Sequence, residues 1–183
     1  MATEAPAESE KLVLKPGTVA AFLSNFKMTA DGESFHMTDL VLANKRVENL
    51  AKSMEECKYV QNFDISVNNI SDINALKDMQ QLIRLNLSDN KIKSLAVLTL
   101  DDQFVHLKWL DVSSNKFSDF PAFKLPNLEY LDISRNKLEK VNEGWTGHEK
   151  LRVLKSVDNK FKNLAPFKNM PKLQELYLES NVI

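Results

Sequence analysis

An eleven-residue pattern recurs along this sequence, and it restricts the possible folds more than any other feature. The pattern has mainly apolar residues at positions one, four, six and eleven and a polar residue at position nine. Seven copies occupy residues 37–47, 60–70, 82–92, 107–117, 128–138, 151–161 and 173–183. Their ninth residues are separated by 23, 22, 25, 21, 23 and 22 residues. A regular period of this length indicates stacked units that bury apolar surface against their neighbours.

Two periodicities alternate inside each unit. Positions three to six alternate polar and apolar residues, which is typical of a short strand with one buried face. After position nine the apolar residues recur at every third position, as in Ile70, Ile73, Leu76 and Met79. This spacing fits 3₁₀ turns or irregular structure. We therefore predict an α/β solenoid with a curved parallel β-sheet on its concave face and 3₁₀ or short helical segments on its convex face.

Asparagine fills the ninth position in six of the seven copies, and Lys45 replaces it in the first. A carboxamide can both donate and accept hydrogen bonds, so it can satisfy backbone groups that become buried where a strand ends in a turn. We predict a structural asparagine column made of Asn68, Asn90, Asn115, Asn136, Asn159 and Asn181. This repeat of about 22 residues resembles leucine-rich repeat proteins of the type named for the regulatory subunit of protein phosphatase 1.

The segments outside the repeats suggest a terminal tail and a cap. Residues 1–15 begin with a small, acidic stretch and are predicted to be disordered. Residues 16–36 are predicted to form an N-terminal helical cap, with Thr18 as N-cap and Val19, Phe22, Leu23 and Phe26 on one face. The repeats fill residues 37–183, and the last is incomplete and uncapped. Its open edge is expected to continue in a longer chain or to rest on a partner.

Composition argues against several classes of function. The 24 basic and 25 acidic residues nearly cancel, so bulk charge predicts neither a nucleic-acid partner nor a membrane surface. No apolar run is long enough to cross a bilayer, and no targeting segment precedes the repeats. The single cysteine, Cys57, indicates a reducing, cytoplasmic compartment and is expected to be a buried thiol. The three histidines fall in unrelated positions, so we predict no catalytic residues, no metal site and no cofactor.

The solvent-facing strand positions carry the candidate binding site. Trp109 and Tyr130 fall at the third position of successive copies, which places them about 5 Å apart on neighbouring strands. Aromatic and arginine side chains are enriched in protein interfaces. We predict a protein-binding concave face formed by Arg84, Trp109, Asp111, Tyr130, Asp132, Lys155 and Tyr177. Alternatively, the two aromatic rings pack on each other only to stiffen the sheet.

Two further features carry weaker interpretations. A basic column follows the asparagines at Arg46, Lys91, Lys116, Lys137 and Lys160. It could meet an acidic surface such as a tubulin tail, or it could simply keep the turns soluble. Trp145 lies between Gly144 and Gly147 and is predicted to fill the core in place of a leucine.

The order and the amino-acid sequence of the first copies resemble one family in particular. Residues 63–90 (FDISVNNISDINALKDMQQLIRLNLSDN) are similar to the axonemal radial-spoke family of leucine-rich repeat-containing protein 23, and the resemblance extends over most of residues 16–183. It implies a non-catalytic scaffold of the ciliary axoneme, with axonemal or radial-spoke subunits as partners. The repeat type also implies two alternatives. One is a regulatory or targeting subunit that binds a phosphatase catalytic subunit, and the other is a dynein-associated light chain.

Overall fold

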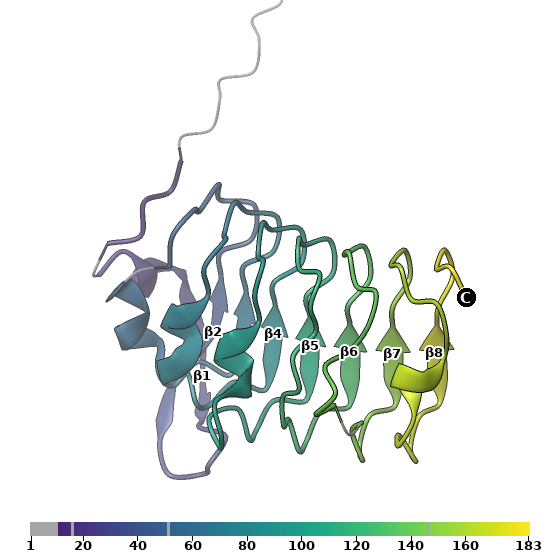
Figure 1. The fold of residues 1–183 in the computed structure, drawn as a ribbon. Coiled ribbons are helices and arrows are strands. Elements are labelled where there is room, and N and C mark those ends of the chain that lie inside the picture. Colours follow the sequence, from purple (N-terminus) through teal and green to yellow (C-terminus); the bar gives the residue numbers. More distant parts are fainter. Residues whose placement is uncertain (1–10, 16, 51, 146) are drawn as a thin grey trace, which may run out of the picture.

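The computed structural model describes residues 11–15, 17–50, 52–145 and 147–183. One eight-stranded sheet runs in sequence order from β1 to β8. Its strands are β1 (Leu23–Met28), β2 (Phe35–Val41), β3 (Asn62–Asp64), β4 (Arg84–Asn86), β5 (Trp109–Asp111), β6 (Tyr130–Asp132), β7 (Val153–Lys155) and β8 (Glu175–Tyr177). Figure 1 shows these strands side by side along the solenoid.

The strands from β2 to β8 are parallel. Each of β3 to β8 occupies the third to fifth positions of one sequence copy, whereas β2 ends at the fifth position and begins before its copy. The fourth-position side chains point into the core, and Leu85, Leu110 and Leu131 are fully buried. Parallel strands in register bring equivalent side chains together, so each repeat packs its core residues onto those of the next.

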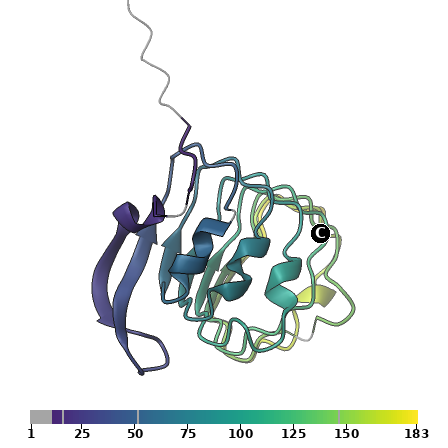
Figure 2. The ribbon, with the colours of Figure 1, turned by 90° about the vertical axis from the view of Figure 1, so that its left-hand side faces the viewer.

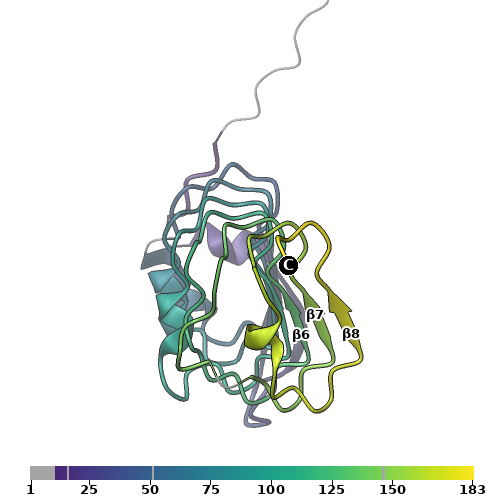
Figure 3. The same cartoon turned by 45° about the vertical axis from the view of Figure 1, so that its right-hand side comes forward.

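The convex side consists of short 3₁₀ turns and irregular chain. The turns are η2 (Lys52–Cys57), η3 (Asn74–Asp78), η4 (Ala96–Thr99) and η5 (Ala165–Phe167). Figure 3 shows the strands and the convex segments as the two walls of the solenoid, with the core between them. The predicted parallel sheet and 3₁₀ convex face are both present.

The prediction of an N-terminal helical cap is wrong. A single 3₁₀ turn, η1 (Val19–Phe22), leads into β1, which pairs antiparallel with β2. Thr18 precedes η1, but its hydroxyl makes no capping hydrogen bond. Of the four residues expected on one buried helix face, Val19 is buried and Phe26 is 66% exposed. The cap is therefore a hairpin, because β1 satisfies the backbone groups along the free edge of β2.

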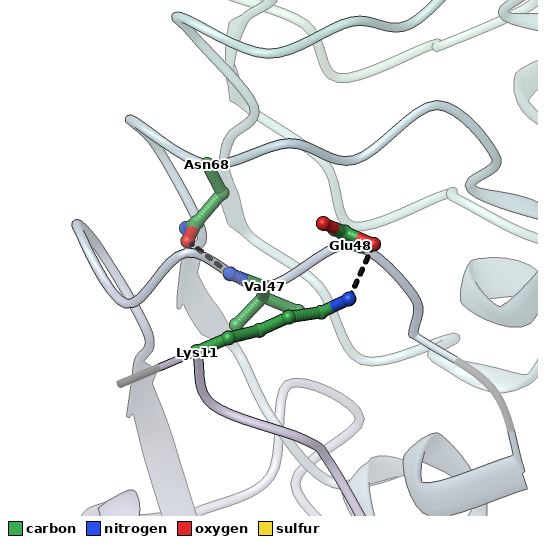
Figure 4. A network of polar contacts seen from close by, with 4 residues as sticks. All are labelled: Lys11, Val47, Glu48 and Asn68. Carbon is green, nitrogen blue, oxygen red and sulfur yellow. Dashed lines mark hydrogen bonds and ion pairs between the residues drawn. The ribbon is translucent and has the colours of Figure 1, made fainter. Parts of the chain in front are cut away.

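Residues 11–15 also depart from the predicted disorder, while residues 1–10 of that segment lie outside the described residues. Lys11 forms an ion pair with Glu48, and the Leu12 amide donates to the Lys45 carbonyl at 3.1 Å. Leu14 is 8% exposed and joins the core. Figure 4 shows Lys11 reaching Glu48 beside the first repeat turn. Apolar burial together with these polar contacts fixes the segment onto the first repeat.

Candidate protein-binding face

The strand register brings the predicted binding residues into two adjacent columns. Arg84, Trp109 and Tyr130 are register partners on β4, β5 and β6. Asp111, Asp132, Lys155 and Tyr177 follow one another in the second column, from β5 to β8. All seven side chains lie on the sheet face opposite the buried fourth-position residues, because successive strand residues point to opposite sides.

The aromatic side chains form a ladder with the neighbouring cations. The Trp109 and Tyr130 rings stack with centroids 5.0 Å apart and planes 10° from parallel. The Arg84 guanidinium lies 4.4 Å from the Trp109 ring centroid. The Lys155 ammonium lies 5.6 Å from the Tyr130 ring and 5.4 Å from the Tyr177 ring. We call these five residues the cation–aromatic ladder.

The ladder geometry determines which atoms a partner can touch. Neighbouring side chains cover the broad faces of the half-buried Trp109 and Tyr130 rings, so the ring edges face solvent. Mutual packing also stiffens the side chains, which lowers the entropy lost when a partner orders them. The geometry is thus compatible with stiffening of the sheet and with a preorganised binding surface.

Two carboxylates lie beside the ladder. Asp111 and Asp132 are register partners on neighbouring strands, and each accepts a hydrogen bond at 2.9 Å, from the amides of Ser113 and Ser134 respectively. Burial is the main cause of the raised pKa of Asp111, to which the negative charges of Asp132 and Asp89 add, whereas hydrogen bonds from Ser113 oppose it. Burial is also the main cause of the raised pKa of Tyr130, and the negative charges of Asp132 and Asp111 raise it further, against the opposing charge of Arg84. Asp111 and Asp132 therefore place two carboxylates close to the aromatic rings and cations of the ladder.

A small hollow adjoins the ladder on the side of β2 and β3, and the sequence-based prediction did not include it. Its volume is about 130 Å³. Besides Arg84 and Trp109, it is lined by Asp39, Leu40, Val41, Asn62, Phe63, Asp64 and Asn86. The repeat frame assigns most of these residues to the two columns, but they are mainly polar and lack the aromatic side chains typical of an interface anchor.

The asparagine column has the geometry that the sequence suggests for a structural role. Asn68 donates from Nδ2 to the carbonyls of Leu42, Ile65 and Ser66, and its Oδ1 accepts from the amides of Lys45 and Val47. Figure 4 shows the bond between Asn68 and Val47. Each asparagine follows a residue with a left-handed φ: Val67, Asp89, Ser114, Arg135, Asp158 and Ser180. The carboxamide thus closes a turn that the backbone alone leaves with unpaired polar groups.

Cys57 and Trp145 are both buried in the core. Cys57 is buried, and burial, with a contribution from Glu56, raises the pKa of its thiol to about 11. Such a thiol is a poor nucleophile at neutral pH. Trp145 is 9% exposed and packs edge-on against Phe120, Phe123 and His148, so it belongs to the core as predicted.

Two further observations concern metal sites and membrane spans. Within the described ranges, no group of three or more His, Cys, Asp and Glu side chains could hold a metal ion. Along the same stretches of chain, no helix combines the length and apolar character needed to cross a bilayer.

Comparison with known proteins identifies the fold. Residues 105–145 match the family described as "Leucine Rich repeats (2 copies)". The leucine-rich repeat domain of APL1B superposes with a TM-score of 0.67 at 22% identity, covering 79% of this chain and 43% of that one. The fold is a leucine-rich repeat solenoid. The functional domain of InlJ from Listeria monocytogenes is also similar, with a TM-score of 0.60, 25% identity, and 75% and 28% coverage.

The sequence relatives of this solenoid are longer proteins. Human leucine-rich repeats and immunoglobulin-like domains protein 3 is 34% identical over 112 residues, which is 60% of this chain but 10% of that protein. A protein phosphatase 1 regulatory inhibitor subunit PPP1R7 homolog from Arabidopsis thaliana is 28% identical over 122 residues, covering 66% of this chain and 35% of the homolog. This chain therefore spans only part of the length of these relatives.

Proposed function

We propose that this protein is a non-catalytic scaffold that holds a partner protein on the concave face of its leucine-rich repeats. The observation that carries the proposal is the Trp109–Tyr130 stack, which is flanked by Arg84 and Lys155 on strands held in register. Rigid aromatic edges beside charged groups are the composition of interface hot spots. A surface fixed by backbone pairing loses little entropy when it binds.

The sequence resemblance over residues 16–183 supports a place for the scaffold in the ciliary axoneme. On this proposal, its partners are radial-spoke or other axonemal subunits, and the protein acts in the cytoplasm and the cilium. The repeat period of about 22 residues and the amino-acid sequence of residues 63–90 support this assignment.

A second candidate is a regulatory or targeting subunit of a protein phosphatase. The similarity to the Arabidopsis homolog named as a regulatory inhibitor subunit favours it, because that similarity covers 66% of this chain. The partner would then be a phosphatase catalytic subunit, bound on the same concave face.

One experiment tests the binding face and separates the two assemblies. A tagged chain is purified from ciliated cells in parallel with the Trp109→Ala/Tyr130→Ala double variant and a Tyr59→Ala control. Tyr59 is a half-buried aromatic residue that stacks on His36, away from the ladder. We expect the double variant to lose at least nine-tenths of the co-purified partner, since two hot-spot residues are worth about 2 kcal/mol or more together.

The identity of the recovered protein decides between the two candidates. Radial-spoke subunits recovered with the wild-type chain support the axonemal scaffold, whereas a stoichiometric phosphatase catalytic subunit supports the second candidate. Full recovery of the partner with the double variant would show that the rings only stiffen the sheet.

A further inference from the structure

The β1–β2 hairpin exposes a cluster of large apolar side chains. Phe26 pairs in register with Met37, and Met28 pairs with Phe35. These four side chains are 66%, 46%, 48% and 55% exposed respectively, and the two phenylalanine rings lie 6.0 Å apart. We call these four residues the hairpin patch. Contiguous apolar side chains at such exposure are uncommon on a surface that meets only water.

The hairpin patch faces the same side as the cation–aromatic ladder. Phe35, Met37, Asp39 and Val41 alternate along β2 with side chains that point toward the core. The register of β2 with β3 then places Asp39 beside Asn62 and Val41 beside Asp64, which belong to the two concave columns. Val41 is itself 53% exposed and lines the hollow. The patch, the hollow and the ladder therefore form one continuous face.

Polar contacts hold the hairpin in this position. Where β1 ends and the turn begins, the Gln61 side chain donates to the Met28 carbonyl. At its tip, Asp31 accepts a hydrogen bond from the Gln81 side chain at 2.7 Å, and its amide donates to the same side chain at 3.1 Å. Figure 2 shows the hairpin, in purple and blue, beside the stacked repeats. The patch is thus fixed relative to the face.

The hollow between the patch and the ladder is lined by two carboxylates, Asp39 and Asp64, and by one cation, Arg84. Burial works against ionisation of Asp39, but hydrogen bonds from Asn62, Asn25 and Thr38, together with the positive charge of Lys27, outweigh it and lower the pKa of Asp39. Asp64 accepts hydrogen bonds from the Ser66 amide and hydroxyl through the same oxygen, Oδ1. Among the described residues, no cation forms an ion pair with either carboxylate.

The whole concave face has the same imbalance of charge. In the third and fifth positions of the seven copies, the acidic residues are Asp39, Asp64, Asp111, Asp132 and Glu175, and the basic residues are Arg84 and Lys155. Both basic side chains already lie over aromatic rings. A partner with a positively charged group would therefore match the face electrostatically.

We propose that the partner of the concave face binds through an amphipathic segment, with large apolar side chains on the hairpin patch and a lysine or arginine at the hollow beside Asp64. The inference rests on the proposed function and extends its binding face from the ladder to the hairpin. Four strand spacings separate β1 from β5, which is roughly 20 Å. A segment of about six extended or 13 helical residues spans that distance.

The test uses a phage-displayed library of random 16-residue peptides selected on the 183-residue chain. The enriched peptides are synthesised, and their affinities are measured by fluorescence anisotropy. We expect apolar residues followed by a lysine or arginine. The Phe26→Ser/Phe35→Ser variant should weaken binding at least tenfold, and Asp64→Asn should weaken it several-fold and reduce its salt dependence. Leu164→Ser is the matched control, since Leu164 is 54% exposed and lies on the convex side at η5.

The variants distinguish failure of this inference from failure of the proposed function. If the Trp109→Ala/Tyr130→Ala variant loses the peptides and the hairpin variant keeps them, the binding face is correct and its extension to the hairpin is wrong. If only the hairpin variant loses them, the two surfaces are separate, and the inference fails. A concentration-dependent dimer in light scattering that the hairpin variant abolishes would assign the patch to a second copy of this chain. A library that yields no peptide sensitive to the hairpin variant also overturns the inference.

Discussion

Asn90 shows what a single residue contributes: its side chain makes hydrogen bonds to buried backbone groups of neighbouring turns. Its Oδ1 accepts from the Ile70 amide at 2.9 Å, and its Nδ2 donates to the carbonyls of Ile65, Leu87 and Ser88. Asn136 makes the three equivalent donations, but its buried Oδ1 has no hydrogen-bond partner within the described part of the chain. The two sites therefore differ by one accepted bond.

This difference yields a prediction for two alanine variants. Asn90→Ala leaves the buried Ile70 amide without its acceptor and removes one of the hydrogen bonds to each of three carbonyls, so we expect it to lower the free energy of unfolding by about 3 kcal/mol. Asn136→Ala should cost about 1 kcal/mol less, because no amide loses its acceptor. Urea denaturation followed by circular dichroism measures both. Equal losses would mean that the accepted hydrogen bond adds nothing to stability.

His148 is a second residue whose surroundings determine a measurable property. It is 6% exposed within an aromatic cluster that includes Phe123 and Trp145, and its Nε2 has no hydrogen-bond partner in the described ranges. Burial lowers its pKa to about 4, against the opposing effect of a hydrogen bond to the Leu125 backbone. The folded protein thus holds His148 neutral.

The lowered pKa predicts a loss of stability in mild acid. Between pH 6.5 and pH 4 the unfolded chain binds a proton at His148 and the folded chain does not, so stability falls as pH falls. From pH 7.5 to pH 5 we expect this histidine to remove about 2 kcal/mol. His148→Phe should flatten the pH dependence of urea denaturation by that amount, while His106→Gln serves as a control outside the cluster. Parallel profiles for wild type and His148→Phe would contradict the prediction.

At the scale of elements, the hairpin shows where sequence reasoning succeeded and where it failed. The repeat frame predicts the strands and the outward columns because alternation along a strand fixes which side chains face solvent. The spacing of Val19, Phe22, Leu23 and Phe26 also fits a helix, and this local pattern led to the wrong cap. A competing signal was present in Asp31-Gly32, a turn pair flanked by alternating apolar residues on both sides.

The repeat pattern in the sequence does not predict the side-chain contacts of the ladder or the presence of the hollow. It places Arg84 and Trp109 on neighbouring strands, but their contact depends on side-chain rotamers. The hollow forms where the short side chains of Asn62, Asp64 and Asn86 lie beside larger ones such as Arg84 and Trp109. Such properties arise from packing in three dimensions, which a one-dimensional period does not encode.

Gly147 controls a connection between elements and gives a prediction at that scale. Its φ is +83°, and a β-carbon there would lie 2.4 Å from the Asn169 carbonyl oxygen and 2.6 Å from that of Lys168. Gly32 has a similar φ of +80° in the hairpin turn, but a β-carbon there would meet nothing within 4 Å. Gly32→Ala therefore isolates the backbone strain, and Gly147→Ala adds a clash with a neighbouring turn.

We expect Gly32→Ala to destabilise the protein by about 1–2 kcal/mol, the cost of a left-handed alanine. Gly147→Ala should cost about 2 kcal/mol more, because overpacking against fixed backbone atoms adds to the strain. Thermal or urea denaturation of the two variants provides the comparison. A Gly147→Ala variant no less stable than Gly32→Ala would show that the Lys168–Asn169 turn moves aside easily.

The whole molecule is a linear stack in which each repeat contacts only its neighbours. Stability is then a sum of repeat terms and interface terms, and a repeat with two neighbours is held more firmly than one with a single neighbour. Leu110 on β5 is fully buried between repeats, whereas Leu176, the equivalent residue on β8, is 40% exposed. The same side chain in the same repeat position thus has two environments.

This contrast predicts unequal costs for the same substitution. Leu110→Ala removes a fully buried side chain and leaves a cavity between two repeats, so we expect a loss of about 3 kcal/mol. Leu176→Ala removes a partly exposed side chain and opens no closed cavity, so its cost should be about 1 kcal/mol. Urea denaturation measures the totals, and hydrogen exchange should show β8 opening more readily than β5 in the wild-type chain. If the two variants were equally destabilised and β5 and β8 exchanged alike, the repeats would unfold as one cooperative unit whose interfaces outweigh the local burial of each leucine.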